Sequence, residues 1–163
     1  ERTIICDGFS KTYAMTGWRL GYGIMPEALA EQLGLLLTHS VTCSATFTQY
    51  AGLEAVTGPQ DRVAQVRDEY QRRRDVMVTD LNAIPGVSCR TPLGAIYAFP
   101  NVKYFEKSSD WIANYLLEEA GVALLPGTSF GAGGEGYLRL CFASSMADIK
   151  TGIARIADAL GNL

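Results

Sequence analysis

The sequence is poor in histidine and has no closely spaced cysteines. His39 is the only histidine among 163 residues, which nearly excludes histidine-based metal sites and Ser-His-Asp triads. The four cysteines, Cys6, Cys43, Cys89 and Cys141, are widely separated, and none belongs to a Cys-x-x-Cys motif. Because they lie among apolar or small residues, we expect reduced, mostly buried thiols of a cytoplasmic protein and no disulfide framework.

The chain also lacks a surplus of positive charge and a long apolar run. Its net charge of −3 gives no support to nucleic-acid binding, which requires a basic face. The most apolar stretch, residues 33–37, is far shorter than a membrane span. Since 48% of the residues are hydrophobic, the chain can nevertheless bury a sizeable core. Neither a nucleic acid nor a membrane is therefore an expected partner.

The first residues of the chain already resemble the approach to a buried strand. The segment from Glu1 to Asp7 has neither an initiator methionine nor the features of a signal peptide. We therefore expect the chain to be a fragment of a longer protein.

The first sixty residues or so alternate short strands with helices, which is typical of an α/β layer. Residues 7–17 are polar and contain glycine, so we expect a loop there, and residues 41–47 are expected to be irregular. Pro26 suits the first turn of a helix, and Gly58-Pro59 ends another. The expected elements are strands over residues 3–6 and 20–25 and helices over residues 26–38 and 48–56.

From about residue 60 onward the pattern is typical of an α+β domain. Asp61 is expected to cap a long helix over residues 61–84, and its arginines are read as a solvated face rather than an anion site. Serine caps and a Ser145-x-x-Asp148 capping box predict two later helices. The other expected elements are strands over 87–90, 95–99, 122–125 and 137–142 and helices over 109–121 and 145–160. The predicted domains are residues 1–58 and 59–163.

The most informative segment runs from Ser10 to Tyr22 and reads SKTYAMTGWRLGY. Lys11 directly follows a buried strand, and an amine held near apolar walls can lose its proton and attack a carbonyl. Arg19 offers a planar fork that suits a phosphate, and Ser10 and Thr12 could add hydroxyl donors. The arrangement suits a carbonyl compound that carries a phosphate. Judged by spacing alone, however, an ordinary surface loop is the more common explanation.

The whole segment resembles the lysine motif of the class I/II aminotransferases that depend on pyridoxal 5'-phosphate (PLP). This resemblance implies that Lys11 binds PLP covalently and acts as general base and acid, and that Arg19 holds the cofactor phosphate. Several members have a serine where Gly8 stands here. Ser10 is then the nearest candidate for the hydroxyl ligand of the phosphate, and hydrogen bonding within the loop is its alternative role.

A second matching segment, GYLRLCFA, spans residues 136–143. Arg139 stands in the middle of this apolar strand and needs an anionic partner, because a buried unpaired guanidinium is very costly. For a strand taken alone, a structural salt bridge is the simpler explanation. In the family, however, the arginine of this strand binds the substrate α-carboxylate, and the resemblance implies the same role for Arg139.

Three weaker matches lie between these two segments. Residues 42–53 resemble the family's dimer-interface segment, which approaches the partner's cofactor phosphate. Residues 94–100 resemble a strand near the substrate, in which Tyr97 is expected to belong to the core. Residues 126–131 resemble the loop ahead of the arginine strand, and their glycines are expected to serve turn geometry.

The resemblance implies the C-terminal portion of a fold-type-I PLP-dependent transferase, with α/β plus α+β architecture. Residues 1–58 would be the end of the large domain, and residues 59–163 the small domain. The whole protein would be a cytoplasmic homodimer of amino-acid metabolism and biosynthesis, acting on amino-acid and 2-oxo-acid substrates. The remaining parts of the cofactor site are expected upstream, so the fragment alone is expected to be inactive. Two alternatives remain open: a PLP-binding effector domain of a transcription regulator, and a PLP-dependent lyase of the same fold.

Overall fold

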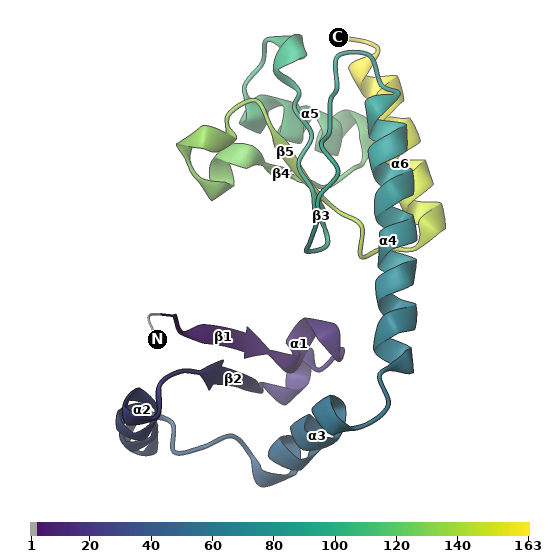
Figure 1. Ribbon diagram of the computed structural model, residues 1–163. Helices are drawn as coiled ribbons and strands as arrows, with labels where there is room; N and C mark the ends of the chain where they lie inside the picture. Colours follow the sequence, from purple (N-terminus) through teal and green to yellow (C-terminus); the bar gives the residue numbers. More distant parts are fainter. Residues whose placement is uncertain (1–2) are drawn as a thin grey trace. The chain divides into compact units, whose positions relative to one another are not determined.

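The computed structural model describes residues 3–163, which fall into two compact units that divide between Gln65 and Val66. Residues 1–2, which the first predicted domain includes, lie outside the described residues. Figure 1 labels the helices and strands of both units. Each unit is described by itself below.

The first unit is built on an antiparallel pair of strands. Strand β1 (Ile5–Gly8) pairs with β2 (Gly21–Ile24), so that Ile5 lies opposite Ile24. The prediction of a loop over residues 7–17 is partly wrong. The segment contains the helical turn α1 (Phe9–Thr12) and the start of the 3-10 turn η1 (Thr16–Trp18). The buried ring of Phe9 accounts for the helical turn, since it packs against the rings of Tyr13 and Tyr22. The distances between ring centroids are 5.6 and 5.5 Å.

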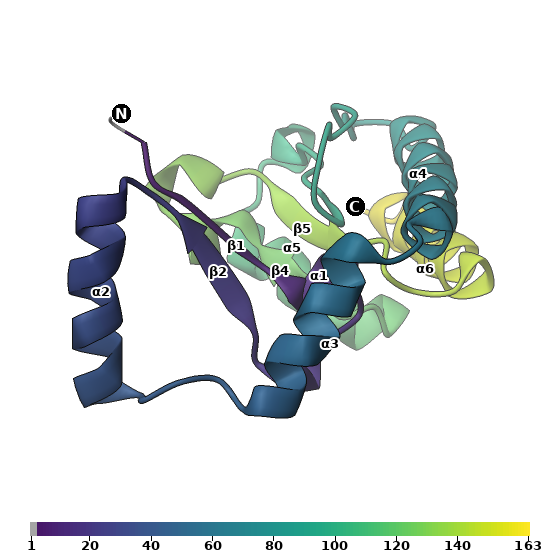
Figure 2. The ribbon, with the colours of Figure 1, turned by 60° about the horizontal axis from the view of Figure 1, so that its bottom comes forward.

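Two helices complete the first unit where the sequence predicts them. Helix α2 (Glu27–Ser40) follows β2, and α3 (Thr46–Thr57) packs near the start of β2 (Figure 2). The approach is so close that a Cβ atom on Gly52 would collide with the Leu20 side chain and touch the Phe9 ring. No residue of α2 is buried. Large apolar side chains of both helices are exposed, among them Leu36 at 61% and Phe47 at 72%. Exposed apolar surface of this extent is typical of surface that packs against other protein.

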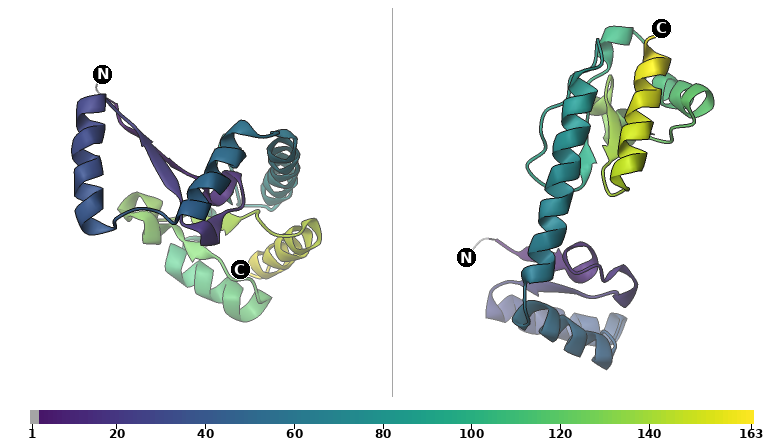
Figure 3. Two further views of the ribbon diagram at one scale, coloured as in Figure 1. Left: turned by 90° about the horizontal axis from the view of Figure 1, so that it is seen from below. Right: turned by 90° about the vertical axis from the view of Figure 1, so that its right-hand side faces the viewer.

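The second unit packs helices against a small antiparallel sheet with the strand order β3-β5-β4. Its core joins the apolar sides of three helices to the central strand. Helices α4 and α6 lie side by side (Figure 3). Helix α4 (Asp61–Asn82) begins in the first unit and continues into the second. The other elements are β3 (Tyr97–Ala98), η2 (Lys103–Phe105), α5 (Ser109–Ala120), β4 (Leu125–Pro126), η3 (Gly127–Phe130), η4 (Ala132–Gly134), β5 (Leu138–Cys141) and α6 (Met146–Leu160).

The starts of α5 and α6 confirm the predicted serine caps, whereas Asp61, expected to cap α4, is the first residue of that helix. Ser108 accepts a hydrogen bond from Trp111 N at 3.2 Å at the start of α5, which ends at Gly121 with a left-handed φ of 63°. Ser145 accepts one from Asp148 N at 3.1 Å at the start of α6. These local signals are correct because each cap satisfies backbone groups that the helix itself leaves unpaired.

The predicted strand over residues 87–90 is wrong and is reduced to one bridge between Ser88 and Asn101. The side-chain amide of Asn82 takes the place of a neighbouring strand. It accepts from Cys89 N at 2.8 Å and donates to Cys89 O at 3.0 Å. The backbone of Cys89 is therefore satisfied without a ladder.

The arginines of α4 form the solvated face that the sequence predicts, with two qualifications. Arg67 and Arg72 are exposed, and Arg72 pairs with Glu69 at 2.9 Å. Arg73 and Arg74 are half-buried, and each also donates to a loop carbonyl of the same unit. These two arginines therefore tie the helix to the loops beside it.

The expectation of mostly buried thiols is wrong. Cys89 alone is buried, and burial raises the pKa of its thiol, whereas Cys6, Cys43 and Cys141 are exposed. Cys141 is exposed because the alternation of β5 turns it away from the core. Within residues 3–163, no helix is both long and apolar enough to cross a bilayer. The same residues contain no cluster of His, Cys, Asp or Glu suited to a metal ion.

Candidate functional site

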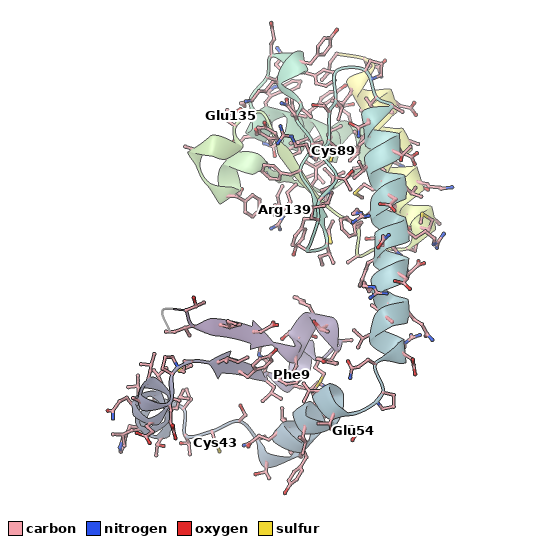
Figure 4. All side chains as sticks on the ribbon, viewed as in Figure 1. Phe9, Cys43, Glu54, Cys89, Glu135 and Arg139 are labelled. Carbon is pink, nitrogen blue, oxygen red and sulfur yellow. The ribbon has the colours of Figure 1, made fainter. Side chains whose placement is uncertain are left out.

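Lys11 lies on α1, the single helical turn that directly follows β1. The buried Phe9, 5% exposed, anchors this turn, and its backbone N–H donates to Leu20 O at 3.2 Å (Figure 4). The Lys11 side chain is exposed. The turn therefore holds the lysine backbone firmly and leaves the amine accessible.

Arg19 occupies the residue between η1 and β2 in a left-handed conformation, with φ 53°. Such a conformation is unfavourable for a residue with a side chain and tends to mark functional positions. One guanidinium nitrogen donates to Thr16 O at 2.8 Å. Arg19 lines a hollow of about 860 Å³ together with Trp18, Ser44 and Thr48. The hollow thus combines a cation with two hydroxyl groups.

Ser10 and Lys11 share α1, but neither lines this hollow. Ser10 is half-buried. At Gly8, a Cβ atom would have Leu20 O as its nearest neighbour, at 3.6 Å, which is an ordinary contact. The backbone therefore does not require glycine at this position, because a Cβ atom fits there.

Arg139 belongs to the second unit and stands on β5, the central strand of the sheet. Its neighbours Leu138 and Leu140 are buried in the core, so the period of two places Arg139 on the opposite face. The guanidinium carbon lies 4.3 Å from the centroid of the Tyr97 ring and 4.2 Å from that of Phe130 (Figure 4 labels Arg139). No carboxylate of residues 3–163 forms an ion pair with it. The structural salt bridge is therefore not formed within the described chain.

The loop that carries Phe130 is fixed by a close approach of two backbone segments. A Cβ atom on Gly127 would collide with Gly134 O, and one on Gly134 would collide with Gly127 O. Gly127 N also donates to Tyr137 O at 2.8 Å. The expectation of turn geometry applies to Gly131, with φ 115°, whereas Gly127 and Gly134 are needed for their small size.

Two features of this region were not identified from the sequence. The prediction that Tyr97 belongs to the core is wrong. The residue is 36% exposed, and its ring lies against Arg139. No sequence signal indicated this, because β3 (Tyr97–Ala98) is only two residues long and either of its faces could be the buried one. Ser109 is completely buried and accepts hydrogen bonds from Gly136 N at 2.7 Å and Tyr137 N at 3.2 Å. It thereby fixes the segment that leads into β5.

Comparison with known proteins settles the family. The family model for "Aminotransferase class I and II" matches residues 1–156. The chain belongs to the class I and II aminotransferases. Enzymes of this family depend on pyridoxal phosphate, and the described fold, a mixture of helices and sheet, is found in solved members of fold type I.

The chain is similar to the aspartate aminotransferase of Rhizobium meliloti, with 38% identity over all of this chain and 42% of that enzyme. It is 43% identical to the probable aspartate/prephenate aminotransferase of Aquifex aeolicus, over 97% of this chain and 41% of that enzyme. The solved aromatic aminotransferase of Pyrococcus horikoshii is 37% identical, with a TM-score of 0.94 over 99% of this chain and 44% of that one. The chain therefore spans about two fifths of the length of these relatives.

Proposed function

We propose that the chain is the C-terminal part of a PLP-dependent aminotransferase that transfers an amino group between an amino acid and a 2-oxo acid. The observation that carries this proposal is the segment from Ser10 to Tyr22, which presents an accessible lysine and an arginine inside a family match over residues 1–156. The relatives named above are aminotransferases. Their names favour amino-group transfer over a lyase or the effector domain of a regulator.

The residues of the first unit fit the cofactor. PLP carries an aldehyde, which requires an accessible amine, and a phosphate, which requires cationic and hydroxyl donors. The exposed Lys11 offers the amine, and the hollow beside Arg19 offers the donors. Lys11 would bind the cofactor, with Arg19 and Ser10 on its phosphate. Ser10 has the weaker support, because it does not line the hollow.

When bound, PLP serves as an electron sink for charge that develops at the substrate α-carbon. The protein's part is to move the proton. Once the substrate amine has taken its place on the cofactor, the freed Lys11 Nζ would take the proton from the substrate α-carbon as general base and return a proton as general acid. The anchored turn α1 supports this role, because it fixes the backbone from which the amine reaches.

Arg139 would bind the α-carboxylate of the substrate. Two observations support this role. The guanidinium faces away from the core, and it has no carboxylate partner among residues 3–163. A guanidinium binds a carboxylate through two parallel N–H bonds, which provides both affinity and orientation.

The fold supports a larger assembly. We propose that residues 1–58 are the end of a large domain and that residues 59–163 form the small domain of a cytoplasmic homodimer. The exposed apolar side chains of α2 and α3 support this assignment, since neighbouring protein would cover them. The intact enzyme, meaning the longer protein of which this chain would be part, is the form to test.

The test is amino-group transfer by the intact enzyme from an amino acid to 2-oxoglutarate. We expect wild type to transfer, and Lys11→Ala to lose nearly all turnover. The matched control is Lys103→Ala, which removes another exposed lysine. Release of ammonia without formation of glutamate would instead indicate a lyase. Unchanged turnover in Lys11→Ala would refute the assigned site.

A further inference from the structure

We propose that Tyr97 and Phe130 form an aromatic clamp that positions the Arg139 guanidinium and makes it selective for planar carboxylates. This inference rests on the proposed function, because it assigns positioning residues to the same carboxylate site. The carrying observation is that the guanidinium carbon lies within 4.3 Å of both ring centroids.

The two rings of the aromatic clamp reach Arg139 from different elements. Tyr97 comes from β3, which pairs with β5, and Phe130 comes from the end of η3. The rings do not pair with each other, whereas Phe130 pairs edge-on with Phe99 at 6.3 Å. The guanidinium therefore contacts each of the two rings separately.

This arrangement has a chemical consequence for anion binding. All N–H bonds of a guanidinium point outward within its plane. Rings that lie against the guanidinium cover it and keep water away, while donors at its edge stay open. An anion must then approach in the plane, and a carboxylate does so with both oxygens. A cation against an aromatic ring is itself stabilised, so the rings also limit the movement of a long, flexible side chain.

The support of the aromatic clamp is unusually firm for an exposed site. Phe130 is 50% exposed, yet its loop is held by the backbone approach of Gly127 and Gly134. Thr128 Oγ1 donates to Asp110 Oδ2 at 2.9 Å and ties η3 to α5. Because Phe130 is half exposed, its ring contributes little to the stability of the core. Its contact with Arg139 gives a reason for its position.

Variants that remove one ring at a time test the clamp in the intact enzyme. Phe130→Leu and Tyr97→Leu remove the π face but keep an apolar side chain, and Phe130→Tyr and Tyr97→Phe keep a ring. Tyr104→Leu is the control, because Tyr104 is 74% exposed and lies against Phe105 instead. The measurements are kcat and KM for an amino acid and for its decarboxylated amine, and the dissociation constant of succinate, which cannot react.

We expect each leucine variant to raise KM for the amino acid and to weaken succinate binding about fivefold, the strength of one partly exposed cation–π contact. The value of kcat should change little, because the carboxylate is held equally before and during reaction. Constants for the amine, and all constants of the ring-retaining variants and of Tyr104→Leu, should stay within about twofold of wild type, less than the loss of one such contact.

Three results would overturn the clamp: succinate binding unchanged in both leucine variants, an equal loss for the amine, or an equal loss when the ring is retained. Each single variant is informative alone, so misfolding of one leaves the other to decide. Failure of the proposed function is distinguishable, because wild type would then transfer no amino group. Succinate binding tests the clamp without any turnover.

Discussion

Replacing Arg139 with lysine separates a substrate-binding role from a purely structural one. Lysine keeps the charge but cannot supply two parallel donors, and its compact ammonium cannot lie against the Tyr97 and Phe130 rings as a planar guanidinium does. No described carboxylate pairs with Arg139, so the substitution breaks no ion pair within residues 3–163. The intact variant should therefore fold and retain PLP.

The expected loss follows from the contacts at stake. One charge-assisted hydrogen bond contributes about 1.5–3 kcal/mol, and lysine still offers a single donor to the carboxylate. Loss of the second bond and of the ring contacts should lower kcat/KM for amino acids by about 2–3 kcal/mol, which is about 30- to 150-fold. Amines that lack the carboxylate should be far less affected, because they never use the fork.

The assay compares half-transamination rates of an amino acid and of its decarboxylated amine in wild type and Arg139→Lys. Thermal unfolding and PLP content, measured on the same samples, report on folding separately. Equal fractional losses for both substrates, or a fall in folded yield that accounts for the whole effect, would refute the carboxylate role. A structural role for Arg139 would then be the better explanation.

Three further predictions concern stability and completeness. Ser109→Ala should lower the free energy of unfolding by about 1–2 kcal/mol in urea titrations. The loss stays moderate because Gly136 N and Tyr137 N each have a second acceptor, Glu135 Oε1 and Gly134 O, and a loss below about 0.5 kcal/mol would contradict the anchor role. Hydrogen bonds from two arginines lower the pKa of Glu69 to about 2, so its stabilising effect is complete above its ordinary pKa of 4.5 and is lost as pH falls through about 2. Acid unfolding of Glu69→Gln should lack this component, and an identical pH profile would exclude it. The isolated 163-residue chain should show no transaminase turnover in a coupled assay, and a rate on the order of 1 per second would contradict this.

The sequence predicts the helices of this chain well and its strands less well. Helices α5 and α6 have side-chain caps and an apolar stripe, which are local signals. The strand expected over residues 87–90 depends on a partner, and the Asn82 side chain takes that partner's place through a contact that no local pattern reveals. The turn at Phe9 was missed because its cause, burial of one ring against β2, is likewise a tertiary contact.

In the candidate site, too, the sequence predicts residues that belong to a motif but not the tertiary contacts around them. Lys11, Arg19 and Arg139 could be proposed from sequence, because long mixed motifs carry them. The surroundings of Arg139 could not, because β3 has only two residues and does not show which of its faces is buried. The position of Phe130 depends on the approach of Gly127 to Gly134, between residues that are not adjacent in sequence.

Covalent attachment of the cofactor to Lys11 is the central claim, and peptide mapping tests it most directly. The intact enzyme is loaded with PLP, reduced with borohydride, digested and analysed by mass spectrometry. We predict that the reduced cofactor mass will lie on the peptide that contains Lys11, and that Lys11→Ala will carry no label. Exposed lysines such as Lys103, Lys107 and Lys150 are internal controls in the same digest. Label on one of these peptides and not on that of Lys11, or label persisting in Lys11→Ala, would contradict the assignment.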